Sequence, residues 1–566
     1  MLRNPNRRTF VQGLGAATAL AGLGLWRPLA HASQGRELAG RHFELFIGQT
    51  PVNITGTPRT AVTINNSLPG PLLRWREGDT VTLRVRNRLA EDTSIHWHGI
   101  LLPANMDGVP GLSFAGIAPG GDYLYSFTLR QSGTYWYHSH SGLQEQAGVY
   151  GAIVIEPREP EAHRYQRDHV LLLSDWSDQA PEALLATLKK QSDGFNYHKR
   201  TLGDFIDDVA QHGWGATVDE RLGWARMRMS PTDLADISAA TYTYLLNGQP
   251  PDGNFTCLFQ PGETVRLRLI NASAMTYFDF RIPGLQLTVI AADGLPVTPV
   301  TVDELRIAVA ETYDLLVTVG DLPAYTLYAQ SMDRSGHARG TLARASGLQA
   351  PVPHPDPRPM LSMVDMGHGE MAAMTGMDHS NMLGMTHPTM TAMQQHPASE
   401  TGNPLVDMQT MAPQPNLADP GIGLRDNGRR VLTYADLRSA YPDPDGREPS
   451  REIELHLTGH MERFAWSFDG VKFSDAAPLR LKYGERVRIT LVNDTMMTHP
   501  IHLHGMWSDL EDEHGHFMVR KHTVDIPPGS RRSYRVSADA LGRWAYHCHL
   551  LYHMETGMFR EVRVDE

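Results

Sequence analysis

Three stretches of the chain repeat one pattern of apolar and polar residues. Each begins with glycine and an acidic residue, alternates apolar and polar side chains, and ends on asparagine; the copies are Gly78–Asn87, Gly262–Asn271 and Gly484–Asn493. Alternation with a period of two is typical of a β-strand that is buried on one face, and the glycine is typical of the turn before it. Three copies of one strand predict three domains of one kind.

The remainder of the chain consists largely of similar short runs separated by turns. Its 566 residues include 51 glycines and 38 prolines, and 41% of its side chains are hydrophobic. This length is enough for three or four domains, and the composition supports packed cores. Short alternating runs with frequent turns predict an all-β fold of sandwich or barrel domains and not helical bundles.

Histidines occur in closely spaced pairs near both ends of the chain. The four His-x-His pairs are His96 with His98, His138 with His140, His502 with His504, and His547 with His549. In a strand, both imidazoles of such a pair share one face, about 6 to 7 Å apart along the chain. A single pair is compatible with an accidental or surface arrangement. Four pairs indicate imidazoles that bind different metal ions of one cluster.

A different set of metal-binding side chains surrounds the last pair. Cys548 lies between its two histidines, so in a strand the thiol faces the opposite side. His553 and Met558 follow, and His499 precedes the third pair. A thiolate, two imidazoles and a weak axial thioether are the ligands of a blue-copper electron-transfer site. The strand that carries Cys548 is therefore expected to serve two metal centres.

These four segments resemble the four copper motifs of the multicopper oxidases, in the same order and at opposite ends of the chain. The resemblance implies a type 1 copper held by His499, Cys548, His553 and Met558, and a type 2 copper held by His96 and His502. It implies a type 3 copper pair held by His98, His138, His140, His504, His547 and His549. Four copper ions would then have complete ligand sets.

The resemblance also implies the reaction and the path of electrons and protons. A reducing substrate is oxidised one electron at a time at the type 1 copper, Cys548 conducts the electrons to its neighbouring histidines, and dioxygen is reduced to water at the trinuclear cluster. Related enzymes carry an acid near the type 2 copper at the position of Asp107, which is therefore expected to deliver protons. An ordinary turn aspartate before Gly108 is the alternative.

The fold that the resemblance implies is the cupredoxin-like Greek-key β-barrel, repeated three times. The middle copy continues from Asn271 into Ala272–Thr276, where the other copies carry histidines, so it is expected to be a spacer without copper ligands. The expected divisions are a signal peptide (1–32), domain 1 (33–160), domain 2 (161–350), a flexible Met/His-rich insertion (351–425), and domain 3 with the type 1 copper (426–566).

The first 32 residues have the features of an export signal. Arg7 and Arg8 precede an apolar stretch from Leu14 to Trp26, and Ala30-His31-Ala32 provides a small-residue cleavage site. The apolar stretch is too short to span a bilayer. A twin-arginine signal is the favoured interpretation and an ordinary export signal the alternative; either predicts a bacterial protein in the periplasm.

A methionine-rich segment separates the second and third domains. Between Met360 and Met411 there are 12 of the 25 methionines of the chain, together with His368, His379, His387 and His396. Few branched apolar or aromatic residues accompany them, so this segment is expected to be mobile. Thioethers and imidazoles are ligands suited to Cu(I), and capture of additional Cu(I) is the favoured hypothesis over a plain linker.

Signal, copper motifs and methionine-rich segment together resemble the periplasmic copper-resistance multicopper oxidases of the copper resistance protein A group. The resemblance implies an oxidase of Cu(I), with phenols as accessory substrates, dioxygen as electron acceptor, and an outer-membrane copper-resistance partner. A copper-sequestering protein and a laccase-like oxidase of organic phenols are the alternatives. The formal net charge of −12 argues against a nucleic acid partner.

Three further residues bear on the substrate and on proton supply. Met497 lies two residues before His499 and is a candidate for docking Cu(I) beside the type 1 site, with ordinary core packing as the alternative. Copper-efflux oxidases commonly carry an acid just before the last type 1 histidine, where this chain has Tyr552. Proton supply from that side is then expected to use water or Glu555.

Overall fold

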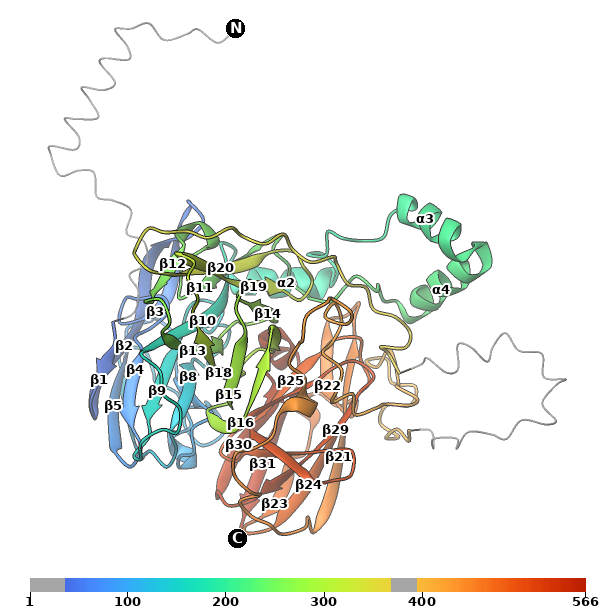
Figure 1. Ribbon diagram of the computed structural model, residues 1–566. Helices are drawn as coiled ribbons and strands as arrows, with labels where there is room; N and C mark the ends of the chain where they lie inside the picture. The colour runs from blue at the N-terminus through green and yellow to red at the C-terminus, as the bar shows by residue number, and fades with distance from the viewer. Residues whose placement is uncertain (1–35, 368–393) are drawn as a thin grey trace, which may run out of the picture.

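The protein is built from three β-sandwich domains, shown in Figure 1 by colours running from blue through green and yellow to red. The computed structural model describes residues 36–367 and 394–566. The expected signal peptide and the central part of the methionine-rich segment lie outside these residues. Each domain consists of two facing sheets, which confirms the prediction of three domains of one kind.

The first domain contains nine strands and one 3₁₀ helix. They are β1 (Leu38–Ala39), β2 (His42–Asn53), β3 (Pro58–Ile64), β4 (Leu73–Arg76), β5 (Thr80–Asn87), β6 (His96–His98), η1 (Ala104–Met106), β7 (Asp122–Thr128), β8 (Gly133–His138) and β9 (Tyr150–Glu156). One sheet has the order β1-β4-β9-β8-β6 and the other β3-β2-β5-β7. The histidine-bearing strands β6 and β8 are therefore neighbours at one edge.

The second domain has two sheets and three α-helices. Its elements are β10 (Arg167–Ser177), α2 (Pro181–Lys190), α3 (Leu202–His212), α4 (Trp214–Met227), β11 (Tyr242–Leu246), η2 (Pro251–Gly253), β12 (Phe255–Leu258), β13 (Thr264–Asn271), β14 (Phe278–Arg281), β15 (Leu287–Ala292), β16 (Leu295–Val302), β17 (Glu304–Ile307), β18 (Thr312–Thr318), β19 (Ala324–Ser331) and β20 (His337–Ala343). The sheet orders are β11-β10-β13-β18-β15-β16 and β12-β20-β19-β14-β17.

The third domain repeats this arrangement. Its elements are η4 (Tyr434–Asp436), β21 (Arg451–His460), β22 (Ala465–Phe468), η5 (Phe473–Asp475), β23 (Leu479–Lys482), β24 (Arg486–Asn493), β25 (His499–Leu503), β26 (Ser508–Glu511), β27 (Phe517–Lys521), β28 (Thr523–Ile526), β29 (Arg531–Ser537), β30 (Gly542–Cys548), α6 (Leu551–Glu555) and β31 (Phe559–Asp565). The sheet orders are β22-β21-β24-β29-β26-β27 and β23-β31-β30-β25-β28.

The repeated sequence pattern forms the same strand in each domain. Strands β5, β13 and β24 each pair in parallel with the strand before them in the sheet and antiparallel with the strand after them. The asparagine at the end of each copy also has one role. Asn87, Asn271 and Asn493 donate from Nδ2 to the carbonyls of Ile117, Ile307 and Ile526 respectively, at 2.7, 3.2 and 2.8 Å. The asparagine thus fixes the loop that leaves each strand.

The helical part of the second domain was not expected from the strand pattern. Helix α3 begins with a capping box in which the Thr201 side chain accepts from the Asp204 amide and the Asp204 carboxylate accepts from the Thr201 amide. Helices α3 and α4 project from the sheets as an arm, whereas α2 lies closer to them (Figure 1). No described helix is both long enough and apolar enough to cross a membrane.

The described parts of the expected Met/His-rich insertion are packed against the domains. Leu361 and Met366 before the gap, and Met408 and Leu417 after it, are buried. The Thr410 amide donates to a carboxylate oxygen of Asp494 at 2.6 Å. Residues 351–367 and 394–425 are thus part of the folded body. The sequence had predicted that the whole interval 351–425 is flexible.

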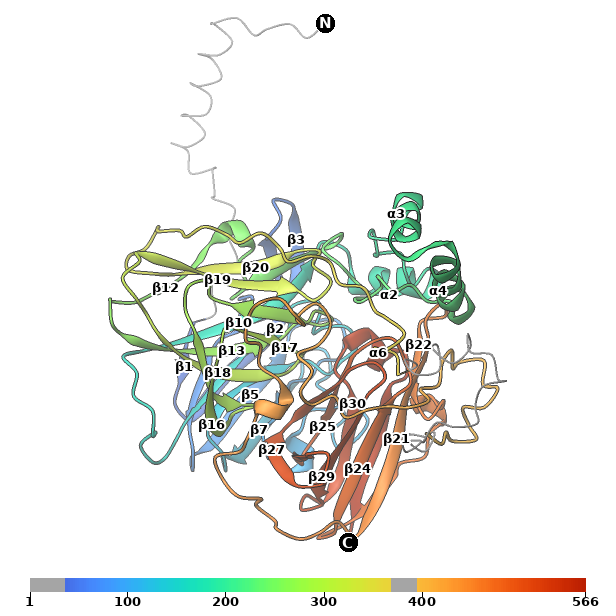
Figure 2. The same ribbon diagram turned by 45° about the vertical axis from the view of Figure 1, so that its right-hand side comes forward.

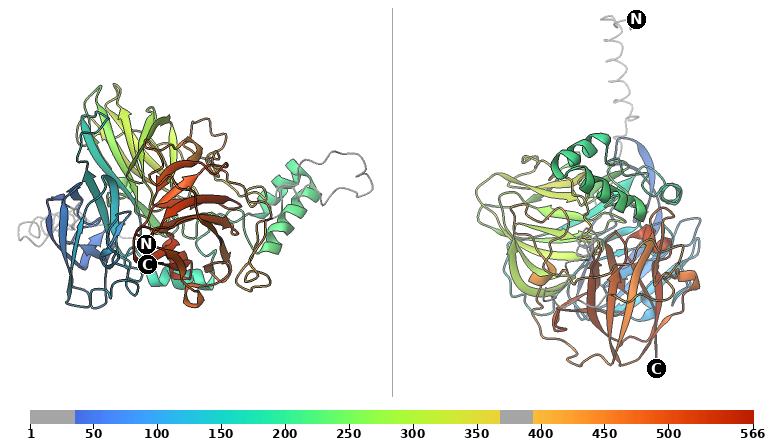
Figure 3. Two further views of the ribbon diagram at one scale, coloured as in Figure 1. Left: turned by 90° about the horizontal axis from the view of Figure 1, so that it is seen from below. Right: turned by 90° about the vertical axis from the view of Figure 1, so that its right-hand side faces the viewer.

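The three domains contact one another, and Figures 2 and 3 show the third domain lying against both others. Thr134 of domain 1 donates to Asp314 of domain 2 at 2.7 Å, and Tyr277 of domain 2 donates to Asp525 of domain 3 at 2.8 Å. The first and third domains meet where their histidine-bearing strands approach. This closed arrangement allows ligands from distant parts of the sequence to form one site.

Candidate metal centre

The paired histidines lie on neighbouring strands in two domains or directly after the ends of those strands. In domain 1, β6 pairs antiparallel with β8, and His96 is opposite His138. In domain 3, β25 pairs antiparallel with β30, and His502 is opposite His547. Because side chains alternate along a strand, both histidines of a pair face the other domain while the residue between them enters its own core. Trp97 illustrates this and is fully buried.

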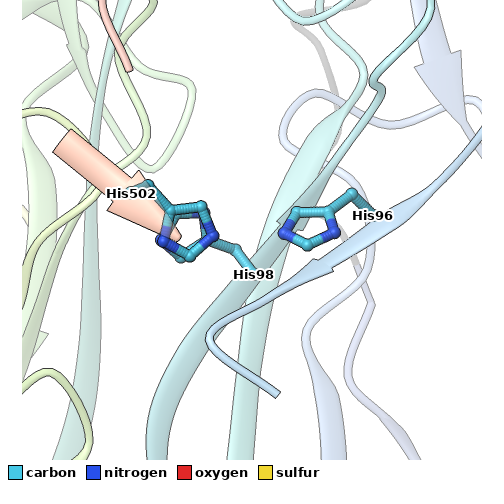
Figure 4. Close-up of side chains that lie close together, drawn as sticks. All are labelled: His96, His98 and His502. Carbon is cyan, nitrogen blue, oxygen red and sulfur yellow. The ribbon is translucent and has the colours of Figure 1, made fainter. Parts of the chain in front are cut away.

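The eight paired histidines converge between the first and third domains. Their nitrogen atoms form three groups in which all ligand atoms lie within 4.8 Å of one another: His96 with His98 and His502, His98 with His138 and His549, and His140 with His504 and His547. Figure 4 shows His96, His98 and His502 side by side. The six residues expected for the type 3 pair thus divide into two triads, and His96 and His502 complete a third group.

Several of these imidazoles present an unpartnered nitrogen to the centre. Among the described residues, His96 Nε2, His138 Nε2, His502 Nε2 and His549 Nε2 are buried without a hydrogen-bond partner, as is His98 Nδ1. A buried nitrogen without a partner is costly, so this arrangement requires an occupant. These five histidines all belong to the two groups that share His98, and such unpartnered nitrogens fit metal ions.

The opposite ring nitrogens are held by the protein. His138 Nδ1 donates to the Ser139 carbonyl at 3.0 Å and lies 2.7 Å from a carboxylate oxygen of Glu145. His502 Nδ1 donates to the His522 carbonyl at 2.6 Å, and His547 Nδ1 to the Cys548 carbonyl at 2.9 Å. Hydrogen bonds of this kind fix the tautomer and the ring orientation of metal-binding histidines.

Burial favours the neutral imidazoles that metal binding needs. It lowers the pKa of His547 to about 3 and holds the pKa of His98, His138 and His504 well below the usual range, with neighbouring histidines adding to the effect. Neutral rings keep a lone pair available for a metal ion.

Cys548 faces a separate group of ligands, as the alternation of strand β30 predicts. Its Sγ lies 3.5 Å from His499 Nδ1 and 3.8 Å from His553 Nδ1, and the two nitrogens are 3.1 Å apart. Burial raises the pKa of the Cys548 thiol well above its usual value. A cation at this position would be needed to hold the thiolate, and the nitrogen and sulfur ligands fit copper.

Met558 belongs to the same buried region. It is fully buried, and its carbonyl accepts from the Cys548 amide at 3.1 Å. On the other side, Thr495 Oγ1 lies 2.7 Å from His499 Nε2, which leaves Nδ1 of that ring directed at the thiol. Three of the residues expected for a type 1 copper, His499, Cys548 and His553, therefore form one group, and Met558 is joined to Cys548 through its backbone.

Asp107 lies in direct contact with the histidine cluster. Its carboxylate accepts from His504 Nδ1 at 2.9 Å and lies 3.2 Å from His96 Nδ1, and its carbonyl accepts from His96 at 2.9 Å. The residue also ends η1, so it is a turn aspartate as well. Its carboxylate is buried and contacts a ligand from each of the two domains.

Two carboxylates near the ligands were missed by sequence reasoning. Asp236 of domain 2 accepts from His553 Nε2 at 2.8 Å, and burial raises its pKa to about 7. Glu145 is buried beside His138, and burial raises its pKa well above the usual range. No sequence motif could identify Asp236, because it is distant from His553 in the chain. Glu145 follows His140 by only five residues, so its position near a histidine pair was visible in the sequence.

Met497 is buried and lines a small pocket beside the cysteine site. Met275 and Met332 of domain 2 line the same pocket, as does Asp236. Three methionines and an aspartate from two domains thus line one pocket near the residues around His499. The middle domain contributes no expected copper ligand, yet it forms one wall of this pocket.

The residues considered for proton supply are placed differently. Tyr552 is buried and its hydroxyl donates to the Pro181 carbonyl at 3.3 Å. Glu555 is exposed at the end of α6. A solvent-open cleft between domains 1 and 2, lined by His140, Ser141, Gln144 and residues 176–182, instead reaches the histidine cluster. Glu145 lies next to this cleft in sequence.

Other residues singled out in the sequence lie outside the candidate metal centre. Cys257 is a buried, free cysteine in β12, as expected for a small core residue. His368, His379, His387 and the methionines between residues 368 and 393 lie outside the described residues. His396 is described and belongs to a different group of side chains in domain 3.

Comparisons with known proteins agree with this geometry. Residues 47–160, 167–347 and 446–566 each match a multicopper oxidase family. The copper resistance protein A homolog of Pseudomonas syringae pv. tomato is 68% identical, covering 99% of both chains. The copper resistance protein A of Escherichia coli is 63% identical, covering 100% of both chains. The multicopper oxidase MmcO of Mycobacterium tuberculosis is 30% identical over 96% of this chain and 91% of its own.

Solved structures share the fold at lower identity. Fet3p, a multicopper oxidase that functions in iron import, superposes with a TM-score of 0.65 at 19% identity, covering 93% of this chain and 91% of its own. The laccase from Botrytis aclada gives a TM-score of 0.62 at 20% identity, covering 94% and 89%. These likenesses confirm the expected cupredoxin-like domains.

Proposed function

The chain belongs to the multicopper oxidase family, within its copper resistance protein A group, and on this premise we propose that it is a periplasmic oxidase of Cu(I). The enzyme would couple one-electron oxidation of Cu(I), with phenols as accessory substrates, to four-electron reduction of dioxygen to water. Its role would be copper resistance, which its relatives of 63 to 68% identity carry in their names.

We infer four copper ions from the ligand groups. His499, Cys548, His553 and Met558 would hold the type 1 ion, and His96 and His502 the type 2 ion. The two triads, His98 with His138 and His549, and His140 with His504 and His547, would each hold one type 3 ion. Copper at these positions supplies electron acceptance at the mononuclear site and dioxygen reduction at the cluster.

The observation that carries the proposal is the position of Cys548 between the two centres. Its thiol lies 3.5 Å from His499 Nδ1, while its neighbours His547 and His549 belong to different triads of the histidine cluster. Two peptide bonds therefore join a soft sulfur site to both triads. A protein that only stored copper would have no use for this connection.

Substrate preference rests on the pocket beside the mononuclear site. Met497, Met275 and Met332 line it together with Asp236. Thioethers favour Cu(I), and a carboxylate near them favours a cation over a neutral phenol. We place the docking of Cu(I) here, with Met497 as the ligand nearest in sequence to His499.

Protons would be supplied by buried carboxyl groups at the cluster. Asp107 contacts both His96 and His504, so it can hold or release a proton beside ligands from each domain. Glu145 contacts His138 at 2.7 Å next to the cleft that reaches His140. Exposed Glu555 is a poorer candidate because no described contact links it to the histidines.

Location, partners and additional copper binding complete the proposal. The first 32 residues would direct export by the twin-arginine route to the periplasm. The methionines between residues 360 and 411 would capture additional Cu(I) for oxidation. An outer-membrane copper-resistance protein would then be the partner that receives copper.

The test is anaerobic mixing of the copper-loaded protein with Cu(I), followed by admission of oxygen. The thiolate-to-copper absorption at about 600 nm that is typical of a blue site should bleach with Cu(I) and recover as oxygen is consumed. Bleaching by a phenol but not by Cu(I) would instead identify an organic-substrate oxidase. Bound copper without this absorption would identify a storage protein.

A further inference from the structure

A second cluster of metal-binding side chains lies in domain 3 and shares no residue with the candidate copper centres described above. His456 of β21 and Asp494 after β24 meet His396 and Glu400, which follow the methionine-rich segment. The ligand atoms of these four side chains all lie within 4.8 Å of one another. No copper motif of the sequence includes any of them.

The four groups are directed at a common point. His456 Nδ1 lies 2.6 Å and His396 Nδ1 3.2 Å from Oδ2 of Asp494. The carboxylate oxygens of Glu400 lie 3.2 Å from His396 Nδ1 and 3.7 Å from His456 Nδ1. Two imidazole nitrogens and two carboxylates thus surround one small volume.

Burial makes this arrangement costly without an occupant. Glu400, His456 and Asp494 are 2%, 1% and 1% exposed, and the His396 side chain is 13% exposed. Glu400 Oε1 is buried and has no hydrogen-bond partner among the described residues. A buried carboxylate oxygen that accepts no hydrogen bond loses its hydration without compensation, and coordination of a cation would supply that compensation.

The far sides of both rings are held in place. His396 Nε2 donates to the Thr410 carbonyl at 3.0 Å, and His456 Nε2 lies 3.3 Å from Glu454. The Thr410 amide donates to the second oxygen of Asp494 at 2.6 Å. These contacts fix the rings with Nδ1 directed at the cluster, as is usual for metal-binding histidines.

In the absence of a cation, a proton occupies the cluster. Burial lowers the pKa of His456, but the carboxylates of Asp494 and Glu400 outweigh it and raise the pKa to about 9. An ion-paired network is therefore the alternative to a metal site. That network leaves Glu400 Oε1 without a partner, whereas a bound metal ion would provide one.

We propose that His396, Glu400, His456 and Asp494 bind a divalent cation of intermediate softness, Cu(II) or Zn(II). Two imidazoles and two carboxylates suit such cations, and the absence of a thioether in this group distinguishes it from a Cu(I) site. Asp494 directly precedes Thr495, whose hydroxyl contacts His499. The new site therefore adjoins the loop that supports the cysteine centre, where the methionine-rich segment rejoins the domain.

The experiment compares metal binding by the copper-loaded wild type and two variants. His396→Gln removes the ligand at the rim, and Glu400→Gln keeps the size of the side chain while removing its charge. Each protein is titrated with Zn(II), and separately with Cu(II), and bound metal per chain is measured by mass spectrometry. His354→Gln, at an exposed histidine before the methionine-rich segment, is the matched control.

We expect one additional ion in the wild type and in His354→Gln, with affinity at least about tenfold weaker in the two cluster variants. With Cu(II), the electron paramagnetic resonance of the additional ion should show two coupled nitrogens, and one in His396→Gln. Competition between the two metals then identifies the preferred cation.

Equal metal content and affinity in all four proteins would overturn the proposal and leave the ion-paired network. The blue absorption, recorded in the same samples, reports folding and loading of the cysteine centre independently. Loss of the proposed oxidase function would therefore remain distinguishable from absence of this site.

Discussion

His553 donates from Nε2 to the carboxylate of Asp236 at 2.8 Å, which joins the third domain to the second. His553 is expected to bind the type 1 copper through its other nitrogen, and Asp236 comes from the domain that carries no expected copper ligand. The middle domain was interpreted as a spacer. Its Asp236 holds one ring of the expected type 1 site, and it supplies two methionines to the lining of the adjoining pocket.

Replacing Asp236 by asparagine should weaken the cysteine centre. The variant keeps the size of the side chain but loses its negative charge, so His553 is held less firmly and becomes a weaker ligand. Loss of such a support typically costs about 10- to 100-fold in metal affinity or activity. Copper retention under dialysis and the intensity of the blue absorption measure it.

The matched control is Asp233→Asn, three residues earlier. Asp233 is also buried, but no described contact joins it to His553. If both variants lost copper equally, the effect would belong to the fold of this loop and not to the contact with His553.

Replacing Asp107 by asparagine should separate the two halves of the reaction. Asp107 contacts His96 and His504 but none of the residues around Cys548. Bleaching of the blue absorption by Cu(I) should therefore keep its rate, while recovery on oxygen admission slows by about 10- to 100-fold. Stopped-flow absorption measures both rates in one sample.

Asp122→Asn is the control because Asp122 is a half-exposed acid of the same domain, paired with Arg84 at 2.8 Å. It should change neither rate. A slower bleaching in Asp107→Asn, with normal recovery, would show that this carboxylate acts on electron entry and would remove it from the proton path.

Regular spacing made most of the architecture predictable from sequence. The strand pattern from Gly78, Gly262 and Gly484 gave three domains because each copy is a complete strand with its turn and its terminal asparagine. The histidine pairs were recognisable because strand geometry places both rings on one face. Patterns that lie within about ten consecutive residues, such as the repeated strand and the histidine pairs, could therefore be interpreted from the sequence alone.

Contacts between distant segments could not be predicted in this way. Asp236 and Glu145 stand in ordinary sequence, and only the packing of domains places them beside His553 and His138. The group of His396, Glu400, His456 and Asp494 is likewise spread over about a hundred residues, so no motif announces it. Helix α3 is different, because its capping residues Thr201 and Asp204 were available in the sequence.

Replacing Met558 by leucine should raise the reduction potential of the cysteine centre. An axial thioether stabilises the oxidised ion slightly, and leucine provides no ligand. The residue is fully buried, and a Met-to-Leu exchange in a core usually costs less than about 1.5 kcal/mol, so folding should persist. A redox titration of the blue absorption measures the change, and an unchanged or lower potential would exclude Met558 as the axial ligand.

Replacing the methionines from Met371 to Met393 by leucine should reduce the number of Cu(I) ions bound per chain. The packed flanks around Leu361, Met366 and Met408 remain intact, so stability should be retained. Anaerobic equilibrium dialysis measures the Cu(I) bound. Oxidation of a phenol serves as the internal control and should be unchanged, whereas unaltered Cu(I) binding would leave this segment as a linker.

Replacing Met497 by leucine should raise KM for Cu(I) and leave phenol oxidation unchanged. Met497 lines the pocket with Met275 and Met332, and leucine would remove the thioether of the proposed Cu(I) ligand while preserving volume. A tenfold rise in KM corresponds to about 1.4 kcal/mol of lost binding. Met496→Leu is the control, because Met496 is also buried but does not line this pocket. Equal effects of the two variants on KM, or equal effects on both substrates, would show that Met497 acts only by packing.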